Sequence, residues 1–240
     1  MYPLPYELYE KYAIRKYGAH GTSHRYISER AAAVLDEPIE DLKLITCHLG
    51  NGCSISAIDH GVAVDTSMGL TPLDGFMMGT RTGTLDPSVV TFIAEKENLS
   101  PSELSDLFNK KSGMKGMTGE SDMRSVWDMI HNDDEPESAA ARTAMDVYIN
   151  RLLKYVGSYT AELGGLDVIT FTAGIGENDA AVRRELAEAL APFGVKIDVE
   201  ANNVRSGEPR VISAPDSTVK MFVFPTNEEL AIARQALTFA

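Results

Sequence analysis

Histidine, asparagine and arginine side chains stand beside glycines at three places in the chain. The first stretch, GAHGTSH, holds His20; the second, HLGNG, holds His48 and Asn51; the third, MMGTRTGT, holds Arg81. Glycines let the backbone take positive φ and let another molecule approach the main chain closely. The exposed amides of such turns could hold phosphate oxygens. A guanidinium fixed in an ordered loop suits bidentate recognition of phosphate or carboxylate.

Each of these features also has an ordinary structural explanation. A Gly-Asn-Gly sequence is a common hairpin turn. A single histidine such as His20 is most often a structural hydrogen-bonding residue, although a histidine held between glycines in a loop is a better functional candidate than most. Arg81 would contribute little as a surface arginine in a mobile loop. The three stretches therefore leave both interpretations open.

Short apolar runs surround the second stretch and predict strands. Residues 44–47 form the first run, residues 53–58 alternate in polarity, and residues 62–66 follow after turn residues. This pattern predicts three strands joined by tight turns, with His48 in the first turn. Ahead of them, Thr22 or Ser23 would cap a helix that runs to about residue 35.

Two further strand ends carry candidate chemistry in the second half of the chain. Residues 166–173 form a nearly continuous apolar run, which predicts a strand buried on both faces. The run ends at the glycine turn 174–178, and a helix is predicted from about residue 181. Strand, glycine turn and helix in this order favour a nucleotide or phosphate site at the helix N-terminus.

A second buried strand, residues 219–224, breaks before Glu228 and Glu229 open the final helix. Both carboxylates favour the positive end of the helix dipole, which explains them structurally. One of them facing a cleft could instead hold Mg²⁺ through its bound waters.

The remaining segments are predicted to support these sites. Residues 67–87 lack any period and predict a long ordered loop. Helices are expected to begin at Asp86-Pro87, at Ser100-Pro101 and at Asp122, with residues 114–121 as a linker. The longest helix, residues 138–163, has an aromatic stripe that favours core or subunit interface over a ligand site.

Composition excludes some classes of partner. The chain has 240 residues, 44% hydrophobic and 24% charged, as in soluble globular proteins. Its net charge of -13 argues against general binding to nucleic acid or to an anionic membrane. Cys47 and Cys53 are expected to be reduced thiols. No stretch is long and apolar enough to span a bilayer, and the first residues do not resemble a secretion signal, so we expect a cytoplasmic protein.

Six blocks of sequence together resemble the acetate kinase family. They are GAHGTSH, ITCHLGNGCSISAI, TSMGLTPLDGFMMGTRTGTLDP, SDMR, TAGIGEN and PTNEEL, and they occur in the family's order across essentially the whole chain. The resemblance implies an α/β fold, a ribonuclease-H-like lobe of the actin, Hsp70 and sugar-kinase type with a mixed sheet flanked by helices. It also implies reversible transfer of the γ-phosphoryl group of ATP to acetate, giving acetyl phosphate and ADP, with Mg²⁺.

The resemblance implies a role for each matching residue. His20 would donate a hydrogen bond to the transferring phosphoryl group, and Arg81 would bind the acetate carboxylate or stabilise that group. Residues facing the β- and γ-phosphates would be His48, Asn51 and Gly52. Residues lining the adenosine pocket would be Asp122, Arg124, Gly174, Ile175, Gly176 and Asn178. Glu228 would help place Mg²⁺. These roles suit phosphoryl transfer, in which positioning and charge stabilisation dominate.

The sequence departs from the family in length. By resemblance, the chain begins at the join between the family's two lobes, so an asparagine, an arginine and the catalytic aspartate of the N-terminal lobe are missing. We expect residues 1–17 to form an interlobe connector and residues 18–240 a C-terminal nucleotide-binding and dimerisation lobe. Such a chain would form a homodimer and would be inactive without the N-terminal lobe. The alternative is a non-catalytic ATP-binding or dimerisation module.

A second departure lies in the first block. The family's loop reads YGFHGTSH, in which the phenylalanine lines the pocket for the acetate methyl group, and Ala19 stands at that position here. The loss of the ring would enlarge the pocket beside Pro72. A third hypothesis is therefore a complete kinase for a slightly longer short-chain acid such as propionate.

Overall fold

The computed structural model describes residues 1–132 and 136–237, apart from the side chains of residues 228, 230, 231, 234 and 235. The chain divides into two compact units. The helical unit holds residues 1–17, 51–53 and 68–151, and the sheet unit holds residues 18–50, 54–67 and those from 152 onward. The helix α7 (Glu137–Glu162) contributes residues to both. The predicted boundary at residue 17 between connector and lobe stays a prediction.

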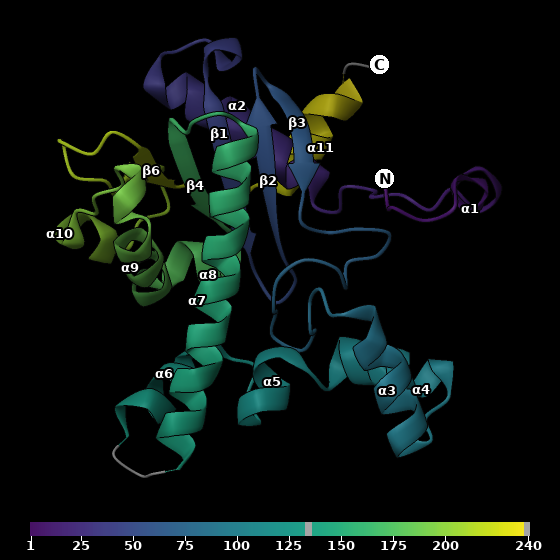
Figure 1. The fold of residues 1–240 in the computed structure, drawn as a ribbon. Coiled ribbons are helices and arrows are strands. Elements are labelled where there is room, and N and C mark those ends of the chain that lie inside the picture. Colours follow the sequence, from purple (N-terminus) through teal and green to yellow (C-terminus); the bar gives the residue numbers. More distant parts are fainter. Residues whose placement is uncertain (133–135, 238–240) are drawn as a thin grey trace. The chain divides into compact units, whose positions relative to one another are not determined.

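A six-stranded mixed sheet has the strand order β3-β2-β1-β4-β6-β5 (Figure 1). The strands are β1 (Lys43–Leu49), β2 (Cys53–Asp59), β3 (Val62–Thr66), β4 (Val168–Thr172), β5 (Arg210–Val211) and β6 (Lys220–Val223). The strands β1, β4 and β6 run parallel, whereas β3 pairs antiparallel with β2 and β5 antiparallel with β6. This mixed sheet flanked by helices confirms the predicted α/β fold class.

The central strands explain the continuous apolar runs of the sequence. All five residues of β4 are buried, and β1 is buried from Leu44 to Leu49. Strands covered on both faces have no solvent side and therefore do not alternate in polarity. In the register of these two strands, Thr46 of β1 stands beside Thr170 of β4. The prediction of a buried strand at residues 166–173 is confirmed.

A long helix of the sheet unit packs directly on the sheet. That helix, α2 (Gly21–Leu35), packs on β1 and β4 and contacts α11 (Glu228–Leu237). Ile27 and Ala31, one turn apart, are fully buried against the sheet residues Leu44 and Phe222. The other helices of this unit are α8 (Ala173–Asn178), α9 (Ala180–Ala189), α10 (Val199–Asn203) and the 3₁₀ turns at Ile39–Asp41 and Ala191–Phe193.

The helical unit contains several short helices besides the first part of α7. They are α1 (Tyr6–Tyr12), α3 (Pro87–Glu97), α4 (Pro101–Lys110), α5 (Gly113–Thr118) and α6 (Met123–His131). Asp86 caps α3 by accepting the amide of Ser88. Ser100 and Glu103 form a reciprocal capping box at the start of α4. These caps confirm the helix starts predicted from the sequence.

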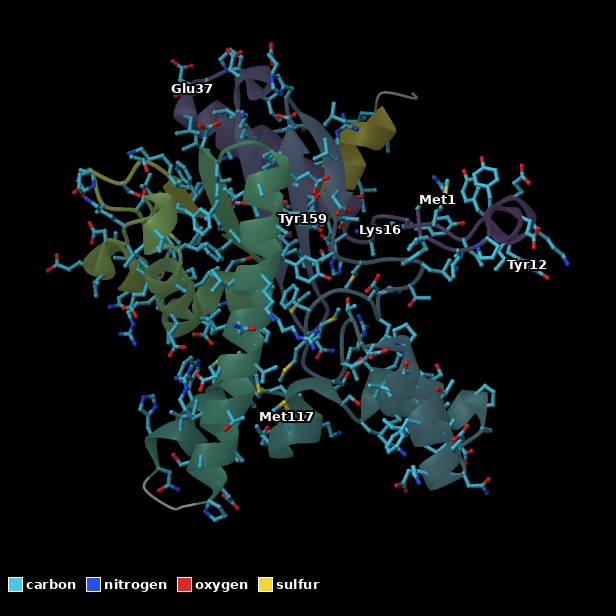
Figure 2. All side chains as sticks on the ribbon, viewed as in Figure 1. Met1, Tyr12, Lys16, Glu37, Met117 and Tyr159 are labelled. Atoms are coloured by element: carbon cyan, nitrogen blue, oxygen red, sulfur yellow. The ribbon has the colours of Figure 1, made fainter. Side chains whose placement is uncertain are left out.

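The aromatic stripe of α7 belongs to the protein core. Tyr148, Leu152, Val156 and Tyr159 are all buried, and Figure 2 labels Tyr159 among the side chains of the helix. Cys47 and Cys53 are buried and form no disulfide bond. In the part of the chain that the structure describes, no helix is long and apolar enough to cross a membrane.

Three local predictions were wrong. His48 lies in β1 rather than in the turn that follows, because the strand continues to Leu49. The helix α2 begins at Gly21 with His20 as its N-cap and without a side-chain cap from Thr22 or Ser23. The expected linker after residue 113 begins as the helix α5, which is anchored by hydrogen bonds from the amides of Met114 to Met78 and of Lys115 to Gly79.

A fourth correction concerns the expected glycine turn after β4, which is the short helix α8. Ala173 adopts the left-handed conformation at φ 66°, and its amide is bound by the Glu177 carboxylate at 3.0 Å. The local glycine pattern predicted a loop, but this carboxylate satisfies the first amide of a helical turn instead.

Candidate active site

Three histidines meet on the sheet unit, at the start of α2 and on β1. We call His20, His24 and His48 the histidine cluster. His20 holds a left-handed backbone conformation, φ 62°, and its Nδ1 lies 2.8 Å from Ser54 Oγ on β2. A residue other than glycine in this conformation is strained, and such strain is concentrated at functional sites. The backbone conformation and the ring contact with Ser54 therefore both fix the orientation of His20, the predicted catalytic histidine.

His24, one helical turn after His20, connects the cluster to the core of the sheet. Its Nδ1 lies 2.6 Å from Thr46 Oγ1, and its Nε2 lies 2.7 Å from Ser54 Oγ. Burial, with a smaller effect of the neighbouring His48 and His20, lowers the pKa of His24 from 6.5 to about 3. This imidazole is therefore neutral at physiological pH. Sequence analysis did not assign His24 to the site, although its spacing of four residues from His20 puts both on one helix face.

His48 completes the cluster from the neighbouring strand. Its ring stacks on that of His20, with 4.1 Å between ring centroids and 21° between planes. Its Nδ1 lies 2.8 Å from Ser23 Oγ of α2. Burial first, and then the charge of a protonated His20, lowers the pKa of His48 to about 4. The structure thus brings together two predicted site histidines as a stacked pair, and His48 is a neutral hydrogen-bonding group rather than a cation.

Four residues that the sequence predicts for the adenosine pocket follow the end of β4. Asn178 donates from Nδ2 to the carbonyl oxygen of Gly174 at 2.9 Å, which closes the short helix that also holds Ile175 and Gly176. Arg183 of α9, only 1% exposed, donates from Nη1 to the carbonyl oxygen of Gly176 at 2.8 Å. Four residues predicted to line the adenosine pocket thus belong to one internally hydrogen-bonded turn.

A single carboxylate connects this turn to the end of β6. Glu177 Oε1 accepts the amides of Ala173 and of Thr226, each at 3.0 Å. Arg210 of β5 donates to the main-chain carbonyl of Glu177 at 3.3 Å. Sequence reasoning did not single out Glu177, although it stands within the TAGIGEN block. The loops at the ends of two parallel strands are therefore held together by one side chain.

The predicted metal residue, Glu228, is the first residue of α11. Its side chain lies outside the described part of the structure. Among the described residues, no group of three or more histidine, cysteine, aspartate or glutamate residues could hold a metal ion. A Mg²⁺ ion that is held mainly by water and substrate phosphates needs only one or two protein carboxylates. A lone carboxylate at this strand end is compatible with such an ion.

The helical unit holds the predicted arginine and one predicted pocket residue together. Arg81 donates from Nη1 to the carbonyl oxygen of Pro72 at 3.1 Å and contacts the Met78 sulfur at 3.7 Å. The chain around it is tightly packed, because a Cβ atom on Gly113 would lie 2.6 Å from the Arg81 carbonyl oxygen. Arg81 is therefore a half-buried guanidinium in an ordered loop, not a mobile surface arginine.

Other predicted residues of the helical unit lie in two places. The Asn51 side chain lies against Gly79, because a Cβ atom added to Gly79 would lie 2.7 Å from Asn51 Oδ1. Asp122 caps α6 and pairs with Arg124 at 2.6 Å in an exposed ion pair. Hydrogen bonds from Arg124 lower the pKa of Asp122 to about 2. Asn51, Gly52, Pro72, Arg81, Asp122 and Arg124 belong to the helical unit, whereas Ala19, His20, His48 and residues 174–178 belong to the sheet unit.

Comparison with known proteins decides the family. The family model of the acetokinase family matches residues 1–234. The chain belongs to the acetokinase family. An acetate kinase from Oleidesulfovibrio alaskensis is 50% identical over 237 residues, which are 99% of this chain and 58% of that protein. The chain thus spans little more than half the length of the curated acetate kinases it matches.

Solved structures of acetokinase-family proteins share the fold. The acetate kinase of Porphyromonas gingivalis superposes with a TM-score of 0.94 at 44% identity, covering 99% of this chain and 59% of that one. A propionate kinase from Francisella tularensis superposes with a TM-score of 0.89, also at 44% identity, covering 98% of this chain and 58% of that one. An acetate kinase and a propionate kinase are thus similar to this chain at the same sequence identity.

Proposed function

We propose that this chain is the C-terminal, nucleotide-binding part of a carboxylate phosphotransferase that makes acetyl phosphate and ADP from ATP and acetate, reversibly. The observation that carries the proposal is the stacked pair of imidazoles, His20 and His48, with 4.1 Å between ring centroids and a buried hydroxyl at the Nδ1 of each ring. A neutral imidazole offers one N–H donor. Two such donors side by side suit the oxygens of a phosphoryl group, whose charge spreads during transfer.

The other predicted residues support the same chemistry. Arg81 offers a guanidinium held by the Pro72 carbonyl, suited to the carboxylate of acetate or to the transferring group. The hydrogen-bonded turn at residues 174–178 would receive the adenosine, together with Asp122 and Arg124. Glu228 would help hold Mg²⁺, which supplies charge neutralisation of the phosphates when it is bound. Asn51 and Gly52 would face the phosphates.

The partners of this chain follow from that function. We propose ATP or ADP with Mg²⁺ and acetate or acetyl phosphate as ligands, a homodimer, and a cytoplasmic setting. A separate N-terminal lobe would supply the catalytic groups that this chain lacks by resemblance. Without them, the chain would bind nucleotide but turn over slowly or not at all.

The test is ADP production from ATP and acetate by this chain alone and after addition of the N-terminal lobe of a family relative. We expect nucleotide binding by calorimetry without turnover for the chain alone, and turnover once the lobe is added. Full activity of the chain alone would contradict the proposal that it is an incomplete catalytic unit.

A second candidate function is a non-catalytic ATP-binding or dimerisation module. Nucleotide binding that never leads to turnover, even with the added lobe, would support it. A kinase for a longer acid is the third candidate, because Ala19 replaces a larger residue of the family pattern. Faster turnover of propionate than of acetate would support this candidate.

A further inference from the structure

The histidine cluster ends in a buried threonine hydroxyl, that of Thr46. Thr46 of β1 is fully buried, and among the described residues His24 Nδ1 is the partner of its Oγ1. Beyond His24, the contacts continue through Ser54 Oγ to His20 Nδ1, at 2.7 Å and 2.8 Å. The four side chains form a linear chain of hydrogen bonds from the core of the sheet to the stacked imidazole pair.

Two arrangements of protons direct all three of these hydrogen bonds the same way along the series of side chains. In the first, Thr46 donates to His24 Nδ1, His24 donates from Nε2 to Ser54, and Ser54 donates to His20 Nδ1. In the second, every donor is reversed, so that His20 donates from Nδ1 and His24 donates to Thr46. In its neutral form, each ring carries one proton in both arrangements. His24 is held neutral by burial, which lowers its pKa to about 3.

The two arrangements differ in what happens to the Thr46 hydroxyl proton. In the first arrangement, every donor in this series of hydrogen bonds has an acceptor. The second leaves the buried Thr46 proton without an acceptor among the described residues, and an unsatisfied buried donor is costly. The first arrangement is therefore favoured, and in it His20 carries its proton on Nε2.

We propose that Thr46, acting through His24 and Ser54, sets the tautomer of His20 so that this ring presents an Nε2–H donor. Thr46, His24 and Ser54 are positioning residues, because they act on His20 rather than on a ligand. The same reasoning applies to His48, whose Nδ1 faces the fully buried Ser23 hydroxyl at 2.8 Å. Both stacked rings then present Nε2–H donors.

This inference deepens the proposed function, on which its consequence for phosphoryl transfer rests. A ring in the other tautomer would direct a lone pair instead of an N–H at an approaching phosphoryl oxygen, and these two electron-rich atoms would repel each other. Two buried hydroxyls thus decide whether the histidine pair attracts or repels an oxyanion. The tautomers themselves can be measured on this chain without any activity.

The experiment uses the full chain labelled with ¹⁵N-histidine and reads the protonation of each ring nitrogen by long-range ¹H–¹⁵N correlation. We expect Nε2–H and unprotonated Nδ1 for both His20 and His24. Thr46→Val removes the hydroxyl with little change of shape, and we expect the Nδ1–H fraction of His20 to rise several-fold. Ser54→Ala should raise the same fraction by cutting the chain beside His20, which serves if the first variant fails to fold.

Thr170→Val is the matched control. Thr170 is the register partner of Thr46 on β4, is equally buried, and its hydroxyl has no hydrogen-bond partner among the described residues. This variant should leave the tautomers unchanged. An Nδ1–H form of His20 or His24 in the wild type, or unchanged fractions in both Thr46→Val and Ser54→Ala, would overturn the inference.

Titration of the labelled chain with inorganic phosphate distinguishes the tautomer inference from the proposed role in binding phosphate. A shift of the His20 and His48 Nε2–H signals on titration supports the phosphate role as well as the tautomer. If the tautomers are as expected but the signals do not respond to phosphate or ATP, the inference that buried hydroxyls set the tautomers stands. That result would count against the proposed function alone.

Discussion

Glu177 Oε1 accepts the backbone amide of Thr226 at 3.0 Å, which joins the loops that follow two parallel strands, β4 and β6. The same oxygen accepts the amide of Ala173, whose left-handed conformation begins the turn after β4. A charged acceptor makes hydrogen bonds about twice as strong as neutral ones. Glu177 therefore fixes the predicted adenosine-binding turn relative to Thr226, two residues before Glu228.

Glu177→Ala should weaken nucleotide binding. The change leaves two amides without their acceptor, at a cost of about 1–3 kcal/mol for each that stays buried. We expect the Kd of ADP, measured by calorimetry, to rise roughly tenfold if about 1.4 kcal/mol of that cost falls on the bound state. Glu188→Ala on the exposed face of α9 is the control and should bind ADP as the wild type does. Equal Kd values for the two variants would contradict the role of Glu177.

Arg183→Met should destabilise the sheet unit strongly. The buried guanidinium donates to Asn202 Oδ1, to the Asn202 carbonyl oxygen and to the Gly176 carbonyl oxygen, all within 2.8 Å. Desolvation lowers the pKa of Arg183 to about 10, so it stays charged at neutral pH. Loss of these bonds should cost at least about 3 kcal/mol of unfolding free energy, measured by denaturant titration. The neighbouring exposed Arg184→Met should change it by less than about 0.5 kcal/mol.

Acid should destabilise the protein through His24. Burial lowers its pKa to about 3 in the folded chain, from the ordinary value of 6.5, so between these pH values the unfolded chain binds a proton that the folded chain does not. Stability therefore rises with pH in this window and is lost as pH falls from 6.5 towards 3, by about 1.4 kcal/mol per pH unit at most from this residue.

The measurement is the unfolding free energy between pH 4 and pH 8 for the wild type, His24→Gln and His60→Gln. The His24 variant should show a shallower pH slope than the wild type. The comparison variant changes His60, which is exposed on the turn between β2 and β3 and lies outside the histidine cluster. A His24 variant with the full slope would assign the acid sensitivity to other groups.

Arg81→Ala and His48→Ala should each slow turnover in the enzyme completed with an N-terminal lobe. Each removes one preorganised group, for which a loss of about 3 kcal/mol in transition-state stabilisation is usual. The measurement is kcat/KM for acetate and for ATP. Arg25→Ala and His60→Ala change exposed residues of the same types and should leave both values within twofold. Wild-type turnover in either site variant would remove that residue from the site.

Ala19→Phe should sharpen the choice of acid. A ring at this position would reduce the space next to a substrate methyl group, and one methylene in such a pocket is worth about 1–3 kcal/mol. We expect the ratio of kcat/KM for acetate over propionate to rise about tenfold, with the KM of ATP unchanged. A ratio that does not move would place residue 19 away from the acid.

Much of the local structure was predictable because its signals lie within a few residues of one another. The buried strand β4 follows from its apolar run, and the starts of α3 and α4 follow from Asp86-Pro87 and Ser100-Pro101. Glycines beside His20, Asn51 and Arg81 marked the loops that hold the candidate chemistry. The six blocks of sequence were specific enough to indicate the family, which the comparison confirmed.

The sequence by itself thus determined the family, the strands and the candidate side chains, because residue type and spacing express these locally. Only the tertiary structure decided which side chains support them. Thr46, His24 and Ser54 come from β1, α2 and β2, and Glu177 reaches Thr226, 49 residues away. These contacts depend on strand order and register, which are selected by packing the whole sheet and its helices. The hydroxyl behind His24 was therefore invisible in the sequence.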